Sequence, residues 1–170
     1  MTHREVPPIL VVAGYSDSGK TTLIERLVPE LRRRGLRVGV VKHLGSHFDL
    51  DSPGKDTHRF WESGADSVGV LAPDRTLVMW RDANADLKAL ASLMPVDLVL
   101  AEGFKSGSGP RILVTGGRAD AGAQWGRGRE VIAAVGGAEA EGPWPAHSPD
   151  DIAGVADRVE AWLLSLRDAR

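Results

Sequence analysis

The chain has 170 residues, of which 42% are hydrophobic and 26% charged, and its formal net charge is −2. This length suits one domain with a core of its own, and the composition is typical of a soluble globular protein. The near-neutral charge gives no reason to expect nucleic acid or an anionic membrane as a partner. The absence of cysteine excludes disulfides and thiol catalysis. We therefore expect a single domain over residues 1–170.

Two further observations concern the location of the protein. The first residues, Met1 to Pro8, lack the apolar segment of a signal peptide. No apolar run approaches the roughly 18 residues that a membrane-spanning helix needs. We therefore expect a cytoplasmic protein. The one dense basic run, Arg32-Arg33-Arg34, falls at a predicted helix end, where cations offset the negative pole of the helix, so we expect a structural role for it.

The first predicted elements are a strand, a helix and a second strand. The β-branched run Ile9 to Ala13 predicts a strand that is buried on both faces, as in a parallel sheet. Residues 21–34 have apolar side chains at helical spacing. Pro29 lies inside this pattern and is expected to kink the helix or split its last turns, and Gly35 is expected to end it. The second strand is expected at residues 36–41.

The rest of the chain continues this alternation. Helices are expected at residues 56–63, 86–94 and 150–166, and strands at 67–71, 77–80, 97–101, 111–115 and 131–135. Strands alternating with helices predict an α/β fold of the P-loop NTPase type, with a mostly parallel central sheet and helices on both faces. Residues 116–128 are rich in glycine, alanine and arginine and are expected to form a flexible surface loop.

A phosphate-binding loop is predicted between the first strand and the first helix. The segment Gly14 to Thr21 fits the pattern G-x-x-x-x-G-K-[ST]. In such a loop glycines permit tight turns, successive N–H groups form an anion nest, and the helix adds its positive pole. Lys20 is expected to reach the β and γ phosphates, and the Thr21 hydroxyl to bind Mg²⁺. The predicted phosphate-binding residues are Gly14, Ser16, Asp17, Ser18, Gly19, Lys20, Thr21 and Thr22.

The magnesium ion of such a loop needs a second acidic group close by. The run Asp97 to Gly103 offers Asp97 at the start of a predicted strand and Glu102 at its end. Ligands of open α/β sheets bind at the carboxyl ends of the strands, so Glu102 is preferred for the metal or its bound water. A solvated loop position for Glu102 is the alternative. Lys20 and Glu102 are the candidate catalytic residues.

A second polar segment follows the strand at residues 36–41. We interpret it as a switch-like loop that reads the γ-phosphate and Mg²⁺. The alternatives are a solvated turn in which Asp56 caps the next helix, or a metal site, against which the lack of cysteine argues. The candidate residues are Lys42, His43, His47, Asp49, Asp51, Lys55 and Asp56.

Several short motifs occur in a fixed order within residues 8–115. They are the phosphate-binding loop, Lys42-His43, Asp49 to Asp56, Ser63-Gly64-Ala65 and Glu102-Gly103-Phe104-Lys105. Together they resemble the molybdopterin-guanine dinucleotide biosynthesis protein B family. The phosphate-binding loop is shared by many proteins. The Lys-His, Pro-Gly-Lys-Asp and Glu-Gly-Phe-Lys combinations are therefore what indicates this family in particular.

The resemblance implies a GTP-binding protein with weak GTPase activity that assists the enzyme joining GMP to molybdopterin. It implies GTP and Mg²⁺ as ligands, that enzyme as partner, molybdopterin as a further candidate ligand, and a homodimer. Lys105 is a candidate contact to the partner or to phosphate. Tyr15 and Ser16 stand where many relatives of the wider class have an additional lysine. No Asn/Thr-Lys-x-Asp motif is present, so guanine specificity rests on the resemblance.

Two other functions fit parts of the sequence. An ATP-dependent small-molecule kinase would need an arginine-bearing lid, for which Arg118, Arg127 and Arg129 are candidates. A metallochaperone GTPase would require metal binding by His43 and His47. Slow hydrolysis is expected in the adapter interpretation, since the phosphate-binding loop has no arginine and no glutamine follows Glu102-Gly103 to orient water.

Overall fold

The computed structural model describes residues 6–45, 55–81, 86–104, 107–137 and 143–169. The chain divides into two compact units, the first made of Met1–His43 with Leu87–Arg170 and the second of Leu44–Asp86. The single domain expected over residues 1–170 stays a prediction. Within the described residues, no helix has the length and apolar content to cross a membrane.

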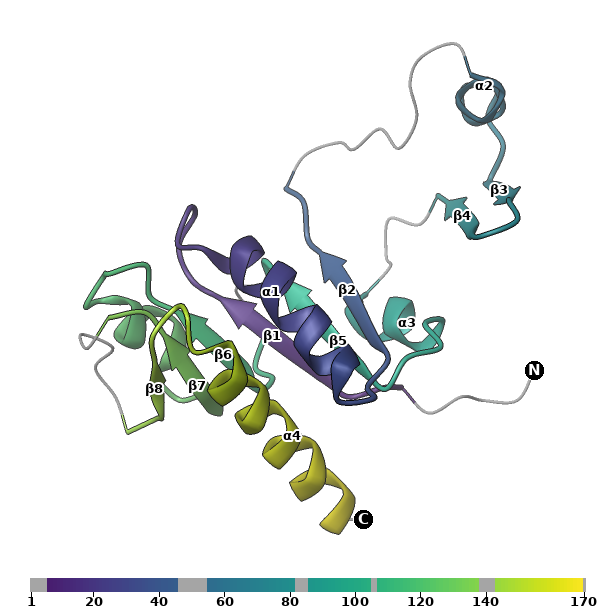
Figure 1. Cartoon of the computed structure of the whole chain (residues 1–170). Coiled ribbons are helices and arrows are strands. Elements are labelled where there is room, and N and C mark those ends of the chain that lie inside the picture. Colours follow the sequence, from purple (N-terminus) through teal and green to yellow (C-terminus); the bar gives the residue numbers. More distant parts are fainter. Residues whose placement is uncertain (1–5, 46–54, 82–85, 105–106, 138–142, 170) are drawn as a thin grey trace. The chain divides into compact units, whose positions relative to one another are not determined.

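The first unit is built on a six-stranded sheet in which all neighbouring strands are parallel (Figure 1). Its strands are β1 (Ile9–Ala13), β2 (Val38–Lys42), β5 (Leu98–Glu102), β6 (Arg111–Val114), β7 (Val131–Val135) and β8 (Ala146–His147). They lie in the order β2-β5-β1-β6-β7-β8. Every residue of β5 is buried, which explains its nearly continuous apolar sequence. The strands predicted in this unit are confirmed, and the two-residue β8 was not predicted.

Two long helices cover one face of this sheet. They are α1 (Lys20–Arg33) and α4 (Ile152–Asp168), which lie next to each other in Figure 1. Leu27 of α1 and Val159 of α4 join Leu100 of β5 in the largest core cluster. Each of these side chains is fully buried.

Shorter elements cover the opposite face, because alternate strand residues point to opposite sides. They are α3 (Leu87–Ser92) and the π-helical turn η1 (Gly122–Gly126). Ala91 of α3 packs with Val99, and Trp125 of η1 packs in a cluster with Val11 and Leu113. The predicted α/β fold with helical elements on both faces is therefore confirmed. Trp125 is only 8% exposed, so the surface loop expected over residues 116–128 is wrong at this turn, where one aromatic side chain anchors the segment.

Helix α1 runs from Lys20 to Arg33 through Pro29, so the proline does not split the helix, and the alternative expectation of a kink stays a prediction. Leu27 and Leu31 are fully buried on either side of Pro29. Burying two leucines contributes roughly 3–6 kcal/mol, enough to offset a proline cost of about 3 kcal/mol. Gly35, with φ 90°, follows the helix as predicted, and Leu36 N donates to the carbonyl of Leu31 at 3.1 Å.

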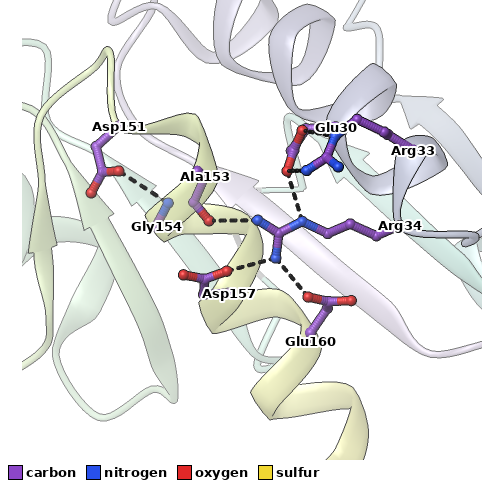
Figure 2. A network of polar contacts seen from close by, with 8 residues as sticks. All are labelled: Glu30, Arg33, Arg34, Asp151, Ala153, Gly154, Asp157 and Glu160. Carbon is purple, nitrogen blue, oxygen red and sulfur yellow. Dashed lines mark hydrogen bonds and ion pairs between the residues drawn. The ribbon is translucent and has the colours of Figure 1, made fainter.

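Arg34 connects the end of α1 to α4 (Figure 2). Its guanidinium donates to Glu30 at 2.8 Å and to both Asp157 and Glu160 at 2.6 Å. It also donates to the carbonyl of Ala153 at 3.1 Å. These contacts confirm that the basic run at this helix end has a structural role.

Replacing Arg34 with Gln is expected to lower Tm by roughly 3–6 °C, because three carboxylates lose their shared partner. Hydrogen bonds from Arg33 and Arg34 lower the pKa of Glu30 to about 2. Since this pKa is lower in the folded state, the stabilisation is complete above the ordinary value of 4.5 and is lost as pH falls toward 2. Thermal denaturation at pH 7 and pH 3 should therefore show a smaller difference between wild type and variant at pH 3. Equal differences would contradict this account, and Arg32→Gln serves as the control.

The second unit contains one short helix and a hairpin. These are α2 (Asp56–Glu62), β3 (Ser67–Leu71) and β4 (Thr76–Trp80). The two strands pair antiparallel in a sheet of their own. Among the described residues of this unit, Val68 is the one buried hydrophobic side chain, whereas Phe60 and Leu71 are 58% and 86% exposed. The described part of this unit therefore has very little core of its own.

Candidate functional site

The loop between β1 and α1 makes a tight strand-to-helix turn. Asp17 and Gly19 adopt left-handed backbone conformations, with φ of 59° and 95°. Gly14 lies so close to β6 that an added Cβ would stand 2.2 Å from the carbonyl oxygen of Val114. Helix α1 begins directly after the turn, at Lys20. The free N–H groups at such a helix start attract anions.

The Lys20 side chain lies within this loop. It is 9% exposed, and its ammonium donates a hydrogen bond to the carbonyl oxygen of Tyr15. A buried ammonium beside the start of a helix gives the turn a concentrated positive charge.

Thr21 and Glu102 meet in front of the loop. The Thr21 hydroxyl donates to the Glu102 carboxylate, with Oγ1 3.1 Å from Oε1 and 3.2 Å from Oε2. Lys42 Nζ lies 3.8 Å from Glu102 Oε1. Strand β5 lies between β1 and β2, and Glu102 is in register with Val12 on one side and with Lys42 on the other. The parallel strands therefore bring these groups to one edge of the sheet, as predicted for Glu102.

Asp97 lies at the other end of β5. Its carboxylate accepts hydrogen bonds from the Arg37 side chain at 2.6 and 3.1 Å and from the Arg37 backbone N–H at 2.8 Å. The side-chain hydrogen bonds are the main reason that its pKa falls to about 2. This placement agrees with the preference for Glu102 over Asp97.

A cleft of about 500 Å³ opens beside these residues. Its lining combines hydroxyls, backbone at the helix start, two lysines and two carboxylates. The lining residues are Ser16, Asp17, Gly19, Lys20, Thr21, Thr22, Lys42 and Glu102. All of the predicted phosphate-binding residues except Gly14 and Ser18 therefore line this cleft.

A smaller pocket of about 250 Å³ shares Gly19 and Thr22 with the cleft. Ser18 also lines it, together with two glycine pairs, Gly116-Gly117 after β6 and Gly136-Gly137 after β7. Sequence reasoning missed this pocket. The signal that could have found it is a pair of glycines after each of two neighbouring strands, which leaves space without side chains.

A cluster of side chains fastens the loop to the segment before η1. The Tyr15 hydroxyl donates to Asp120 Oδ2 at 2.9 Å, which is the main reason that the pKa of Tyr15 is raised. The Arg118 guanidinium lies 4.1 Å from the centre of the Tyr15 ring and forms an ion pair with Asp120 at 3.1 Å. The Trp125 ring packs edge-on against Tyr15 with centroids 5.8 Å apart. No local sequence pattern predicts this cluster.

The remaining switch-loop candidates are placed differently. Lys42 reaches the cleft, whereas the His43 ring packs edge-on against Phe104 at 5.2 Å. Lys55 and Asp56 begin α2 in the second unit, where Asp56 is the first helical residue rather than its cap. His47, Asp49, Asp51 and Lys105 lie outside the described residues. No group of three metal-ligating side chains occurs within the described ranges.

Comparison of the sequence with known proteins agrees with the resemblance seen in the motifs. The family model for molybdopterin guanine dinucleotide synthesis protein B matches residues 9–136. The molybdopterin-guanine dinucleotide biosynthesis adapter protein of Escherichia coli strain K12 is 39% identical over 111 residues, which are 62% of this chain and 63% of that protein. The protein of the same name from Haemophilus influenzae is 41% identical over 111 residues, which are 63% of this chain and 62% of that protein.

Solved structures agree over a larger part of the chain. The crystal structure of molybdopterin-guanine biosynthesis protein B has a TM-score of 0.76 and 32% identity, covering 91% of this chain and 98% of that one. The Bacillus subtilis MobB structure has a TM-score of 0.74 and 29% identity, covering 91% of this chain and 96% of that one. The sequence matches span about 63% of the length of the curated E. coli relative. Since the family model covers most of the chain, the protein belongs to the molybdopterin guanine dinucleotide synthesis protein B family.

Proposed function

We propose that the cleft beside the loop binds the phosphates of GTP together with Mg²⁺. The observation that carries this proposal is the contact of the Thr21 hydroxyl with the Glu102 carboxylate, at 3.1 and 3.2 Å, next to the buried Lys20 ammonium. The three groups supply a cation for phosphate oxygens and two kinds of oxygen ligand for a metal.

The residues present fit a magnesium ion. Mg²⁺ prefers oxygen ligands and keeps several waters, so it is bound by one or two protein groups together with phosphate oxygens. Thr21 and Glu102 would be those groups. Lys42, 3.8 Å from Glu102, would neutralise part of the carboxylate charge when no metal is bound. When bound, the ion would neutralise charge on the phosphates.

The guanosine part is assigned to the smaller pocket. That pocket shares Gly19 and Thr22 with the phosphate cleft, so a nucleoside attached to phosphates in the loop would extend into it. The preference for guanine is inferred from the family, since the sequence lacks the usual guanine-reading motif.

For the whole protein, we propose the role that the names of its relatives describe, which is that of an adapter in molybdopterin-guanine dinucleotide biosynthesis. The partner would be the enzyme that attaches GMP to molybdopterin, with molybdopterin itself as a further candidate ligand. Hydrolysis is proposed to be slow, since the Arg118 guanidinium is held by Tyr15 and Asp120 and the loop has no arginine. A cytoplasmic homodimer is proposed as well. The exposed Phe60, Leu71 and Val78 of the second unit are apolar surface that a second copy would cover.

Replacing Glu102 with Gln tests the metal role. The change removes one negative charge and keeps the shape, so GTP binding in the presence of Mg²⁺ should weaken about tenfold or more, while binding without Mg²⁺ should be equal or tighter. Isothermal titration with and without Mg²⁺, on wild type and variant, measures both effects.

Glu25→Gln is the matched control, since Glu25 is an exposed glutamate on α1. Unchanged magnesium dependence in Glu102→Gln would contradict the metal role and transfer it to Asp49 or Asp51. A large loss of thermal stability would instead show that Glu102 is structural.

A further inference from the structure

An arginine-lined groove lies at the amino end of β7, away from the phosphate cleft, which lies at the carboxyl ends of β1 and β5. It has a volume of about 900 Å³. Arg127, Arg129 and Arg158 line it, and Glu130 is the one acidic side chain among the described residues of its lining. The candidate lid residues Arg127 and Arg129 thus belong to this groove. Among the described lining residues, three arginines and one glutamate leave an excess of positive charge, which favours an anionic occupant.

The shape of the sheet creates this groove. Strand β8 pairs with β7 only at Ala134 and Val135, so within the described residues the first part of β7 has no strand partner on that side. The pairing of β7 with β6 is also irregular, because Arg111 is in register with Val131 and Ile112 with Ala133. Such bulges re-aim side chains and are frequent beside functional sites.

The groove residue Arg129 shares a hydrogen-bond acceptor with a buried cation, Arg111, which has no carboxylate partner among the described residues. Arg111 is fully buried, and its guanidinium donates only to the backbone carbonyls of Gly107, Gly109 and Trp125. Arg129 donates to the same Trp125 carbonyl at 3.4 Å. Burial and then the Arg129 charge lower the pKa of Arg111 to about 10. Two guanidiniums at one carbonyl oxygen repel each other, and an anion bound beside Arg129 would offset that repulsion.

The groove suits a compact anion better than an added peptide strand. A strand would bond to the free backbone of β7, but the carbonyl of Ile132 already accepts from Arg158 Nε at 3.2 Å. The groove also has an apolar wall formed by Pro143, Trp144 and Pro145. Guanidiniums match the geometry of phosphate oxygens, and the wall can cover a ring.

We propose that this arginine-lined groove binds a phosphorylated small molecule with an apolar or aromatic body. Arg127, Arg129 and Arg158 contact the phosphate group, and Trp144 contacts the body of the ligand. The groove lies at the opposite end of the strands from the phosphate cleft, so this proposal does not depend on GTP binding.

Titration of the full chain with phenyl phosphate tests the proposal. Phenyl phosphate should bind saturably and more tightly than either inorganic phosphate or phenol. Arg158→Gln and Arg127→Gln should each weaken it roughly tenfold or more, since each removes a charge-assisted hydrogen bond. Arg167→Gln, on an exposed arginine of α4 outside the groove, should change the affinity less than twofold. Far-UV circular dichroism checks that each variant is folded. Arg127 is exposed, and among the described residues its side chain has no hydrogen bond or ion pair whose loss would disturb the fold.

Several results would overturn the proposal. Equal affinity in the Arg127, Arg158 and Arg167 variants would show unspecific attraction. Binding that is lost in Lys20→Ala and unaffected by the groove variants would place phenyl phosphate in the phosphate cleft instead. Tighter binding of a penta-glutamate peptide than of phenyl phosphate would show that the groove takes an acidic peptide.

Discussion

Lys20→Ala should weaken GTP binding at least about a hundredfold and change GMP binding much less. The ammonium is expected to contact the β and γ phosphates, and GMP has neither. Two charge-assisted hydrogen bonds contribute roughly 3–6 kcal/mol, which corresponds to more than a hundredfold in affinity. Titration calorimetry of the variant with GTP, GDP and GMP measures the loss for each nucleotide.

The matched control is Lys88→Ala, since Lys88 is an exposed lysine on α3. An equal loss of GTP and GMP affinity in Lys20→Ala would mean that the lysine shapes the loop rather than binding the outer phosphates. The same samples can be assayed for phosphate release. Turnover of the wild type should be slow, and fast turnover without a partner would contradict the adapter role.

Gly14→Ala should destabilise the protein by about 3 kcal/mol or more, which lowers Tm by roughly 6–12 °C. The new Cβ would stand 2.2 Å from the Val114 carbonyl oxygen and 2.8 Å from Ser18 Oγ. The carbonyl belongs to the backbone of β6, so relief of the clash requires β1 and β6 to move apart. Thermal denaturation measures the loss.

Gly109→Ala provides the comparison, because a Cβ at Gly109 meets no atom within 4 Å. It should leave Tm within about 2 °C of the wild type, in line with surface substitutions. A stable Gly14→Ala protein that still binds GTP would show that the contact between the loop and β6 can relax at little cost.

Local sequence patterns were enough to predict the part of the site whose elements follow one another directly along the chain. The strand Ile9 to Ala13, the loop after it and α1 are adjacent in sequence, so one segment specifies all three. The position of Glu102 needed one further rule, that parallel strands present their carboxyl ends at one edge. The 3.1 Å contact between Thr21 and Glu102 agrees with that rule.

The features that were missed depend on contacts between distant residues. Tyr15 and Asp120 are 105 positions apart, and the residues that flank each of them in the sequence do not predict this hydrogen bond. Trp125 anchors η1 because it packs against Val11 and Leu113, which no local periodicity reveals. Strand β8 is two residues long and pairs with β7 through its backbone. Two residues are too few to show the side-chain pattern from which strands are predicted.

The uneven burial of the two units has a consequence for how the chain opens. Strand β5 is buried along its whole length, so its amides should exchange with solvent deuterium only when the first unit unfolds globally. The hairpin of β3 and β4 has one buried hydrophobic residue, Val68, among its described neighbours. Its amides should exchange through local opening at a much smaller free energy. If a second copy covers this hairpin, the protection of the hairpin amides from exchange would rise with protein concentration. The protection of the β5 amides would depend on protein concentration far less.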